Sequence, residues 1–595
     1  MTVYYIRGNG QVELCQKDFI ARGGQGQVFG RENIVYKLYD DPAQMIPDAK
    51  IRELSILGRP DMLIREAKIL IPEQILMDKK NRPVGFTMKR AADTWPLSRF
   101  FSNDFRKRHN ITDDLTIQLV ENIRKGISLI HSAGCLIVDG NEFNYLVDKK
   151  DKATPYFIDT DSYQTPKFPA TAIMPSIRDL HSEKFTELTD WFSFAVISCL
   201  LFVGVHPFKG RHPDFKGNDV IARMDANVSI FNPDVHIPPA ARNLDSIPSH
   251  YHSWFIEMFE KGERKIPPEK AGKMLPAARK IFNTGSNITT SENFIIRHVK
   301  TYDSPLIRFQ IRAGCRIAQT QDKIFIDEVS YDADPDTEVI FSARKLKPIL
   351  VTIKDSFLSL VTPQAETVRS GSNLLEPVRF GPIRAKDFII AENTLYVRYD
   401  ENLTEIKFDD LKDRITGFVS NTWKIMPNAC EVFDGVIYQN VLGKPYLIFP
   451  LPTKSREPGR CIISSVAELE NVRISDAKHD KGVCILTIHD QNALHRWHRC
   501  HQMVLRFDET YTGYDCQITS DIDPVSPDFV TLPNGIVISM NDDGAIEIFS
   551  CNPAIYSINR IEDSVIRTSM RLCKDGSQVH FMKEKSLFQL TMKNR

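Results

Sequence analysis

The second half of this 595-residue chain is a long succession of β-hairpin signals, and this repetition limits the possible folds more than any other feature. Beyond about residue 294, apolar runs alternate with short polar turns. Examples are ILVTIKDSFLSLV from Ile349, DGVIYQNVLGKPYLIFPL from Asp434 and NGIVISMNDDGAIEIFS from Asn534. Successive units are spaced by roughly forty to fifty residues, the period of four-stranded propeller blades. We therefore expect a β-propeller of six or seven blades over residues 294–595.

A pair of β-sandwiches is the alternative fold for this half. The propeller is favoured because one closed ring accounts for regularly spaced hairpins and leaves no exposed edge strand. Residues 284–293 are mostly small and polar, which predicts a linker between domains. A chain of this length also exceeds what one hydrophobic core supports, so two or more domains are expected.

Residues 1–283 have a different pattern, with short strands first and helices later. In DDLTIQLVENIRKGISLIHSAG, apolar residues recur every three or four positions from Leu115 to Ile130, which predicts an amphipathic helix ending near Gly134. The most apolar stretch, Trp191 to Val205, is fifteen residues long and indicates a buried helix, since a membrane span needs more. The fold class expected is multidomain, α+β followed by all-β.

Composition narrows the choice of partners and compartment. Acidic and basic residues balance at 76 each, which favours neither a nucleic-acid binder nor a membrane-surface protein. The eleven cysteines have no CxxC spacing, as is typical of reduced thiols, and the N-terminus lacks a signal-peptide pattern. We expect a cytoplasmic protein without nucleic-acid or membrane partners, of unknown oligomeric state.

The stretch DFIARGGQGQVFG, residues 18–30, places a glycine-rich turn between two strand-like runs. Gly23, Gly24 and Gly26 permit the close backbone approach that a phosphate requires. Lys37 on the next strand supplies a positive charge near them. A plain hairpin turn explains the glycines at least as well, so the turn alone does not establish a phosphate site.

Further charged residues follow in a fixed order. The segment DAKIRELSILG carries Glu53, an ion-pair partner for Lys37, and Glu66 is its rival for that role. In IVDGNEFNYLV, Asp139 and Asn144 stand five positions apart between two apolar runs, and in PYFIDTDSYQ an apolar strand ends at Asp159.

The order of glycine turn, strand lysine, helix glutamate, Asp-x-x-x-x-Asn and strand-end Asp resembles the protein-kinase fold, over about residues 15 to 283. More narrowly, DGNEFNYLV together with IDTDSYQ is similar to a bacterial protein-kinase-like family with Asp-x-Asn-x-x-Asn and Asp-Thr-Asp-Ser-Tyr-Gln motifs. The resemblance implies a bilobal protein-kinase-like fold, with an N-lobe of about residues 1–90 and a C-lobe of about 91–283, fused to the β-propeller.

The resemblance also implies an ATP- and Mg²⁺-dependent Ser/Thr protein kinase whose propeller docks a protein substrate or regulator. Asp139 would accept or orient the proton of the substrate hydroxyl, and Asn144 and Asp159 would hold Mg²⁺. Asp190 would begin the apolar helix that supports the catalytic loop. The residues expected around the nucleotide are Gly23, Gly24, Gly26, Val28, Lys37, Glu53 and Met88.

Departures from the family pattern keep alternatives open. Ile137 and Val138 replace the His-Arg of typical kinases, which leaves no arginine there to bind a phosphorylated activation loop, and Ser176 replaces the glutamate of Ala-Pro-Glu. Every charged group needed for ATP and metal is present, which favours catalysis. A pseudokinase-type nucleotide-binding scaffold that assembles partners through the propeller, and a small-molecule kinase, are the two alternatives.

Three other motifs have simpler interpretations. HDQNALHRWHRCH suggests a metal site, but His495 and His498 would point apart on a strand, so a hairpin with solvated imidazoles is favoured. The basic cluster FRKRHN, residues 105–110, is interpreted as a solvated helix start or loop and not as a nucleic-acid patch. His131 is expected to be structural, and Cys135 to be part of the core.

Overall fold

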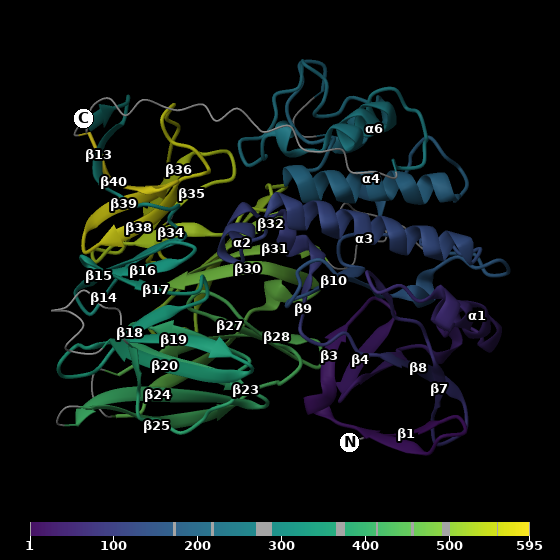
Figure 1. The fold of residues 1–595 in the computed structure, drawn as a ribbon, viewed down its shortest axis with the longest axis horizontal. Coiled ribbons are helices and arrows are strands. Elements are labelled where there is room, and N and C mark those ends of the chain that lie inside the picture. Colours follow the sequence, from purple (N-terminus) through teal and green to yellow (C-terminus); the bar gives the residue numbers. More distant parts are fainter. Residues whose placement is uncertain are drawn as a thin grey trace.

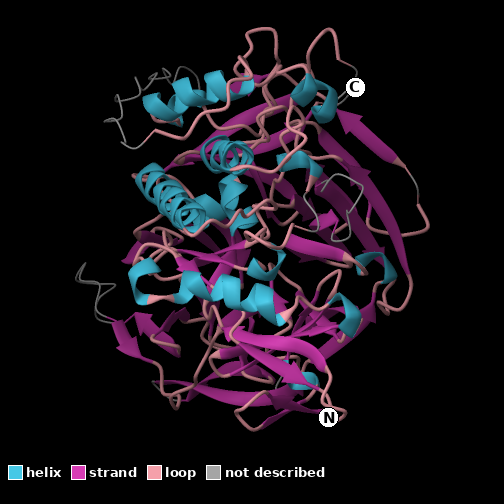
Figure 2. Ribbon diagram, turned by 90° about the vertical axis from the view of Figure 1, so that its right-hand side faces the viewer, coloured by secondary structure: helices cyan, strands magenta, loops and turns pink. Residues whose placement is uncertain are grey.

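The computed structural model describes residues 2–170, 174–215, 219–268, 288–363, 375–411, 414–453, 457–490, 500–555 and 557–593. Within them, a mixed α/β region is followed by an all-β region of antiparallel sheets in a propeller-like arrangement (Figure 1). This confirms the predicted change from mixed to all-β structure along the chain. The side view in Figure 2 shows most of the helices above the strands that lie near the N-terminus.

The first unit is a seven-stranded sheet in the order β2-β1-β7-β8-β5-β4-β3. Its strands are β1 (Thr2–Ile6), β2 (Gln11–Leu14), β3 (Phe19–Arg22), β4 (Gly26–Arg31), β5 (Ile34–Tyr39), β7 (Gln74–Met77) and β8 (Pro83–Lys89). Side chains alternate along a strand, so Tyr36 and Leu38 pack in one apolar cluster, and Val35 and Tyr39 pack in another. Lys37 therefore points to the same face as Val35 and Tyr39.

Helices and a small sheet complete the first region. They are α1 (Asp48–Leu54), α2 (Asn103–Arg108), α3 (Asp113–Ser132), α4 (Glu187–Val203), α5 (Val220–Asp225) and α6 (Ser249–Phe259), with β6 (Lys68–Ile69), β9 (Thr94–Pro96), β10 (Tyr145–Asp148) and β11 (Pro155–Phe157). The small sheet has the order β6-β11-β10-β9.

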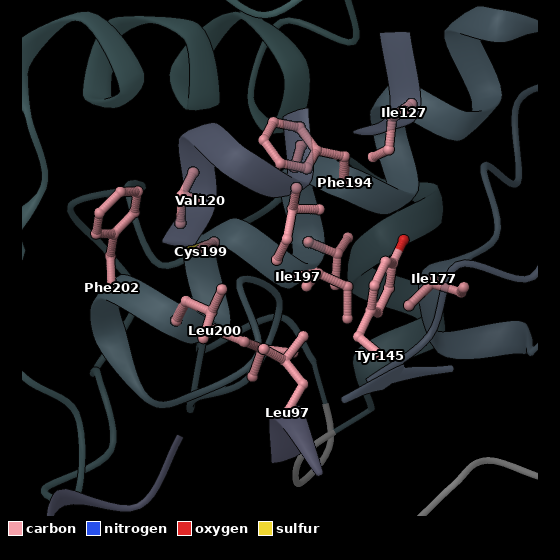
Figure 3. Close-up of a cluster of buried hydrophobic side chains, with 14 of the residues drawn as sticks. Leu97, Val120, Ile127, Tyr145, Ile177, Phe194, Ile197, Cys199, Leu200 and Phe202 are labelled. Atoms are coloured by element: carbon pink, nitrogen blue, oxygen red, sulfur yellow. The ribbon is translucent and has the colours of Figure 1, made fainter. Parts of the chain in front are cut away.

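The two long helices agree with the sequence prediction. Thr112 caps α3 by accepting a hydrogen bond from the Leu115 amide at 3.2 Å, and Gly134, with a φ of +74°, follows its end. The apolar stretch from Trp191 forms the buried helix α4, whose side chains pack with those of α3 in one core that also contains Tyr145 (Figure 3). No helix in the described part of the chain is long and apolar enough to cross a bilayer.

The second region contains six four-stranded sheets and one five-stranded sheet in its described residues. The first three are β14 (Arg308–Arg312), β15 (Cys315–Gln319), β16 (Lys323–Ile326) and β17 (Val329–Asp332); β18 (Glu338–Phe341), β19 (Pro348–Lys354), β20 (Phe357–Pro363) and β21 (Leu375–Pro377); and β22 (Asp387–Ala391), β23 (Thr394–Tyr399), β24 (Asn402–Leu411) and β25 (Arg414–Lys424). The next three are β26 (Cys430–Val432), β27 (Ile437–Val441), β28 (Lys444–Leu451) and β29 (Arg460–Ser465); β30 (Val472–Asp480), β31 (Val483–Asp490), β32 (Cys500–Phe507) and β33 (Tyr514–Ser520); and β34 (Asp528–Thr531), β35 (Ile536–Met540), β36 (Ile546–Ser550) and β37 (Ile558–Ile561).

The five-stranded sheet joins the two ends of this region. It has the order β12-β13-β40-β39-β38 and contains β12 (Ile288–Thr290), β13 (Phe294–Thr301), β38 (Arg571–Asp575), β39 (Gln578–Lys583) and β40 (Ser586–Met592). Phe294 of β13 lies opposite Met592 of β40 in an antiparallel pair. Because β13 pairs with β40, the edge of β40 that would otherwise be unpaired is covered.

A seam of ion pairs joins the two regions. The 3-10 helix η5 (Leu97–Phe101) and α2 contact β26 and β30, the first strands of their sheets, and Figure 1 shows α2 beside β30. Arg99 donates to Glu431 at 2.7 Å, and Arg108 donates to Asp476 at 3.0 Å. A cavity of about 1050 Å³ lies at this seam and is lined by residues of both regions. The first region thus contacts β26 and β30 through charged side chains of these strands.

The basic cluster at residues 105–110 belongs to this seam, and the prediction that it is solvated is wrong. Arg106 is 7% exposed and donates to the Asp113 carboxylate at 2.9 Å and to the Leu201 carbonyl at 3.0 Å. The Lys107 carbonyl accepts a hydrogen bond from the Gln321 side chain at 2.8 Å. The burial arises from contacts with distant segments, which local composition does not encode.

Asp104 of α2 and Arg571 of β38 form an ion pair across the seam, with side chains 17% and 18% exposed. We expect Asp104→Ala to lower the free energy of unfolding, because the Arg571 guanidinium would stay largely buried without this partner. Asp528 lies 3.7 Å from Arg571 and keeps part of its charge balanced. The loss should be about 2 kcal/mol, below the roughly 3–5 kcal/mol typical of a fully buried pair. Urea denaturation followed by tryptophan fluorescence measures it.

The matched control is Asp543→Ala, which breaks the more exposed pair of Asp543 with Arg560. An exposed pair contributes about 0–1 kcal/mol, so this variant should unfold close to the wild-type midpoint. Equal losses in the two variants would show that the seam pair contributes no more than a surface pair.

Candidate functional site

Lys37 joins the N-terminal sheet to the segment that follows β11. Its ammonium lies 2.8 Å from Oδ1 of Asp159 and 2.7 Å from Oδ2 of Asp161. The side chains of Lys37 and Asp161 are 11% and 2% exposed, whereas that of Asp159 is 41% exposed. The structure therefore brings together two predicted site residues, Lys37 and Asp159, that are far apart in the sequence.

The two carboxylates decide the protonation state of Lys37. Burial alone would lower the pKa of Lys37, but Asp159 and Asp161 outweigh it and hold that pKa above its ordinary value. Conversely, Lys37 lowers the pKa of Asp159. The Tyr39 hydroxyl donates to Oδ2 of Asp161 at 2.7 Å, and burial raises the pKa of Tyr39 so that it remains a donor. The group is thus a charged cluster at neutral pH.

The predicted pairing of Lys37 with Glu53 is not what the structure shows. Glu53 accepts a hydrogen bond from the Lys167 amide at 3.3 Å, and Glu66 contacts the Lys125 ammonium at 3.4 Å. Asp159 and Asp161 already balance Lys37, so a third carboxylate beside them would be repelled. From α1 it is instead the buried Lys50 whose charge interacts with Asp161 and Asp159, although burial lowers its pKa.

The loop that carries Asp139 is hydrogen-bonded to Asp190, which lies at the start of α4. The Asp190 carboxylate accepts hydrogen bonds from the Ile137 amide at 2.8 Å, the Val138 amide at 2.9 Å and His131 Nε2 at 2.9 Å. Val138 has a φ of +64°, which is costly for a β-branched residue. Two hydrogen bonds to a buried carboxylate offset that cost. The expectation that His131 is structural is confirmed.

Asp139 and Asn144 are tied to each other and to the end of the β10–β11 hairpin. The Asn144 side-chain amide donates to the Asp139 carbonyl at 2.8 Å, which leaves its Oδ1 as an acceptor. Oδ1 of Asp139 accepts from the Met174 amide at 2.9 Å, and burial raises the pKa of Asp139. The Ile158 amide donates to the Asn144 carbonyl at 3.0 Å. Asn144 and Asp159 therefore leave the hairpin at the same end.

The glycine turn between β3 and β4 is attached to the strand that carries Lys37. The Gly23 amide donates to the Gly26 carbonyl at 2.8 Å. A Cβ on Gly26 would lie 2.0 Å from the Leu38 carbonyl oxygen, so only glycine fits there, whereas a Cβ on Gly24 would meet no atom within 4 Å. Gly26 is thus required by packing, and Gly24 leaves open space at the tip of the turn.

Val28 and Met88 share one apolar cluster. It also contains Val35 and Phe86, with Ile20 packed against it. Val28 lies opposite Lys37 in the β4–β5 pairing. The two apolar residues predicted to contact a nucleotide therefore lie on the elements next to Lys37, where an apolar ring could be packed.

Arg473 is a site residue that the sequence reasoning missed. It lies on β30, and its guanidinium carbon is 4.6 Å from the centre of the Phe143 ring. His489, opposite Arg473 in the β30–β31 pairing, meets the same Phe143 ring edge-to-face, with the two ring centres 5.4 Å apart. Burial lowers the pKa of Arg473, while Asp159, Glu142 and Asp139 oppose this change through their charges. No local pattern near residue 473 marks it, because its role depends on the docking of the two regions.

Corrections also apply to the histidine-rich stretch. His489 and His501 were expected as solvated imidazoles, but they are 5% and 8% exposed. His489 Nε2 lies 4.0 Å from Cys500 Sγ, and His501 Nε2 lies 3.1 Å from Asp490. His495 and His498 lie outside the described residues. The prediction that Cys135 belongs to the core is confirmed by its 1% exposure.

Three of the site residues carry oxygen atoms of the kind that a hard cation binds, although no group of three or more His, Cys, Asp or Glu side chains in the described part of the chain is placed to hold a metal ion. Asp159, Asp161 and Asn144 supply carboxylate and amide oxygens, the ligands that Mg²⁺ prefers. Oδ1 of Asp161 is buried and has no hydrogen-bond partner among the described residues, so it is an acceptor without a donor.

We find no family model and no curated protein that matches this sequence, so inference about function depends on the site itself.

Glu142 provides a test of the electrostatics. Burial raises its pKa to about 7, with Asp139 adding to the rise and Arg473 opposing it. In the unfolded chain this carboxyl loses its proton near pH 4.5, so wild-type stability should fall as pH rises from about 4.5 to 7. Glu142→Gln removes this dependence. Relative to wild type, the variant should gain about 2 kcal/mol between pH 5 and pH 8, measured from urea midpoints at each pH.

The control for this pH series is Glu183→Gln, since Glu183 is exposed. Its difference from wild type should stay constant across the same pH range. A constant difference for Glu142→Gln as well would contradict the raised pKa of Glu142.

Proposed function

We propose that this protein is an ATP- and Mg²⁺-dependent protein kinase, most simply of the Ser/Thr type. In this proposal the first region has a bilobal protein-kinase-like fold and the second is a β-propeller. The observation that carries the proposal is the contact of Lys37 with Asp159, together with a loop in which Asp190 binds the Ile137 and Val138 amides and Asn144 binds the Asp139 carbonyl. Strand lysine, strand-end Asp and Asp-x-x-x-x-Asn are the elements that the sequence resemblance requires to meet.

Each residue has a role that phosphoryl transfer needs. This reaction depends on positioning and on neutralisation of charge more than on covalent chemistry by the protein. Asp139 would accept the proton of the attacking hydroxyl, and its raised pKa makes it a better base than an exposed aspartate. Asn144 and Asp159, with Asp161 beside them, would hold Mg²⁺, which neutralises phosphate charge when bound. Lys37 would bind the α- and β-phosphates under the turn of Gly23, Gly24 and Gly26.

A nucleotide-binding scaffold is the second candidate. It is favoured by one observation, that Lys37 is paired with two carboxylates and not with Glu53. A lysine held this way can bind nucleotide without being aligned for transfer. For the kinase and for the scaffold alike, we infer that the protein acts in the cytoplasm. We also infer that a protein substrate or regulator docks on the propeller, on a surface that α2 does not cover.

The decisive measurement is transfer of label from γ-labelled ATP in the presence of Mg²⁺, with and without cell lysate. Asp139→Ala and Asp159→Ala should each lower transfer at least about 100-fold, because they remove the base and a metal ligand. Lys37→Ala should lower it to a similar extent by removing the charge that orients the phosphates.

The control is Asp61→Ala, which changes an exposed aspartate and should leave transfer at the wild-type level. Nucleotide binding by the wild-type protein without any transfer would favour the scaffold. Transfer that persists in Asp159→Ala would contradict the assigned site.

A further inference from the structure

Arg473 differs from the other arginines at the seam between the two regions. Arg99, Arg108 and Arg571 each form an ion pair with a carboxylate. Arg473 has no carboxylate oxygen within 4.0 Å and donates no hydrogen bond, as far as the described residues show. Arg473 is instead held by stacking on Phe143, whose ring keeps the guanidinium at a fixed place on the Asp139 loop.

The surroundings of Arg473 identify the part of the site that it faces. The contact with Phe143 places its guanidinium on the loop between Asp139 and Asn144, and the charges of Asp159, Glu142 and Asp139 act on it. In the proposed kinase, Asp159 binds the metal and Asp139 binds the attacking hydroxyl. The transferred phosphoryl group passes between these two positions. In the proposed kinase, Arg473 would therefore lie on the side of the site where the terminal phosphate meets the Asp139 loop.

We propose that Arg473 binds the γ-phosphate of the nucleotide, so that the second region supplies a residue to the active site of the first. This inference rests on the proposed function. A guanidinium that is withdrawn from water without a hydrogen-bonded partner is unfavourable, and a phosphate satisfies it with two parallel hydrogen bonds. Arg473 would also provide a positive charge beside a catalytic loop in which Ile137 and Val138 replace the usual His-Arg.

A purely structural role predicts different behaviour. An arginine that only balances Asp159, Glu142 and Asp139 would change stability and would affect all nucleotides alike. An arginine that binds the γ-phosphate discriminates a triphosphate from a diphosphate. The comparison of ATP-like and ADP affinity therefore separates the two roles without any need for catalytic activity.

The experiment is calorimetric titration of the full chain with Mg²⁺ and either ADP or a non-hydrolysable ATP analogue. In Arg473→Ala, affinity for the ATP analogue should fall about 10- to 100-fold, as for loss of a charged hydrogen bond. Affinity for ADP should stay within about twofold of wild type. Arg473→Lys keeps the charge but not the bidentate geometry, so its affinity for the ATP analogue should be intermediate.

Arg460→Ala, on the exposed outer strand β29, is the matched control and should bind both nucleotides as wild type does. Urea midpoints of all variants show whether they are folded, and Arg473→Gln gives a second neutral replacement if the alanine variant unfolds. Equal loss for ADP and the ATP analogue, or no loss for either, would overturn the inference about Arg473. A wild-type protein that binds neither nucleotide would instead overturn the proposed function, and the inference with it.

Discussion

The buried contact of Lys37 with Asp159 and Asp161 is the interaction on which the site depends. It connects strand β5 of the N-terminal sheet to the segment after β11, at distances of 2.8 and 2.7 Å. A lysine that loses both partners in a buried position would be a costly unpaired charge. The contact therefore ties the sheet to the helical part.

The second region contacts both of these parts and so limits how they move relative to each other. On the sheet, Asn428 donates to the Lys17 carbonyl at 2.9 Å and accepts from Arg90 at 2.7 Å. On the helical part, the Lys209 ammonium lies 2.9 Å from Asp523, in a pair that is almost fully buried.

Local patterns predicted the elements, and long-range docking decided the details. The 3.6-residue periodicity of α3 and the apolar run of α4 are local signals, so the helices could be predicted. The meeting of Lys37 with Asp159 followed from the resemblance alone. Glu53 was misassigned because Lys37 pairs with the acids after β11, whereas Glu53 contacts Lys167. The burial of Arg106, His489 and His501 depends on surfaces contributed by distant segments, which no local window contains.

The dependence of the site on the second region also changes how its domains should be understood. Residues 1–283 were expected to form a complete kinase-like unit to which a recruitment domain is attached. The structure places Arg473 on the loop of Asp139, and the half-buried Asp104 against Arg571. A chain ending before β12 would lose the partner of Phe143 and expose the charged face of α2, so the first region would lack both a stable seam and a cation beside its loop. Through Arg473 the second region therefore contacts the Asp139 loop of the first.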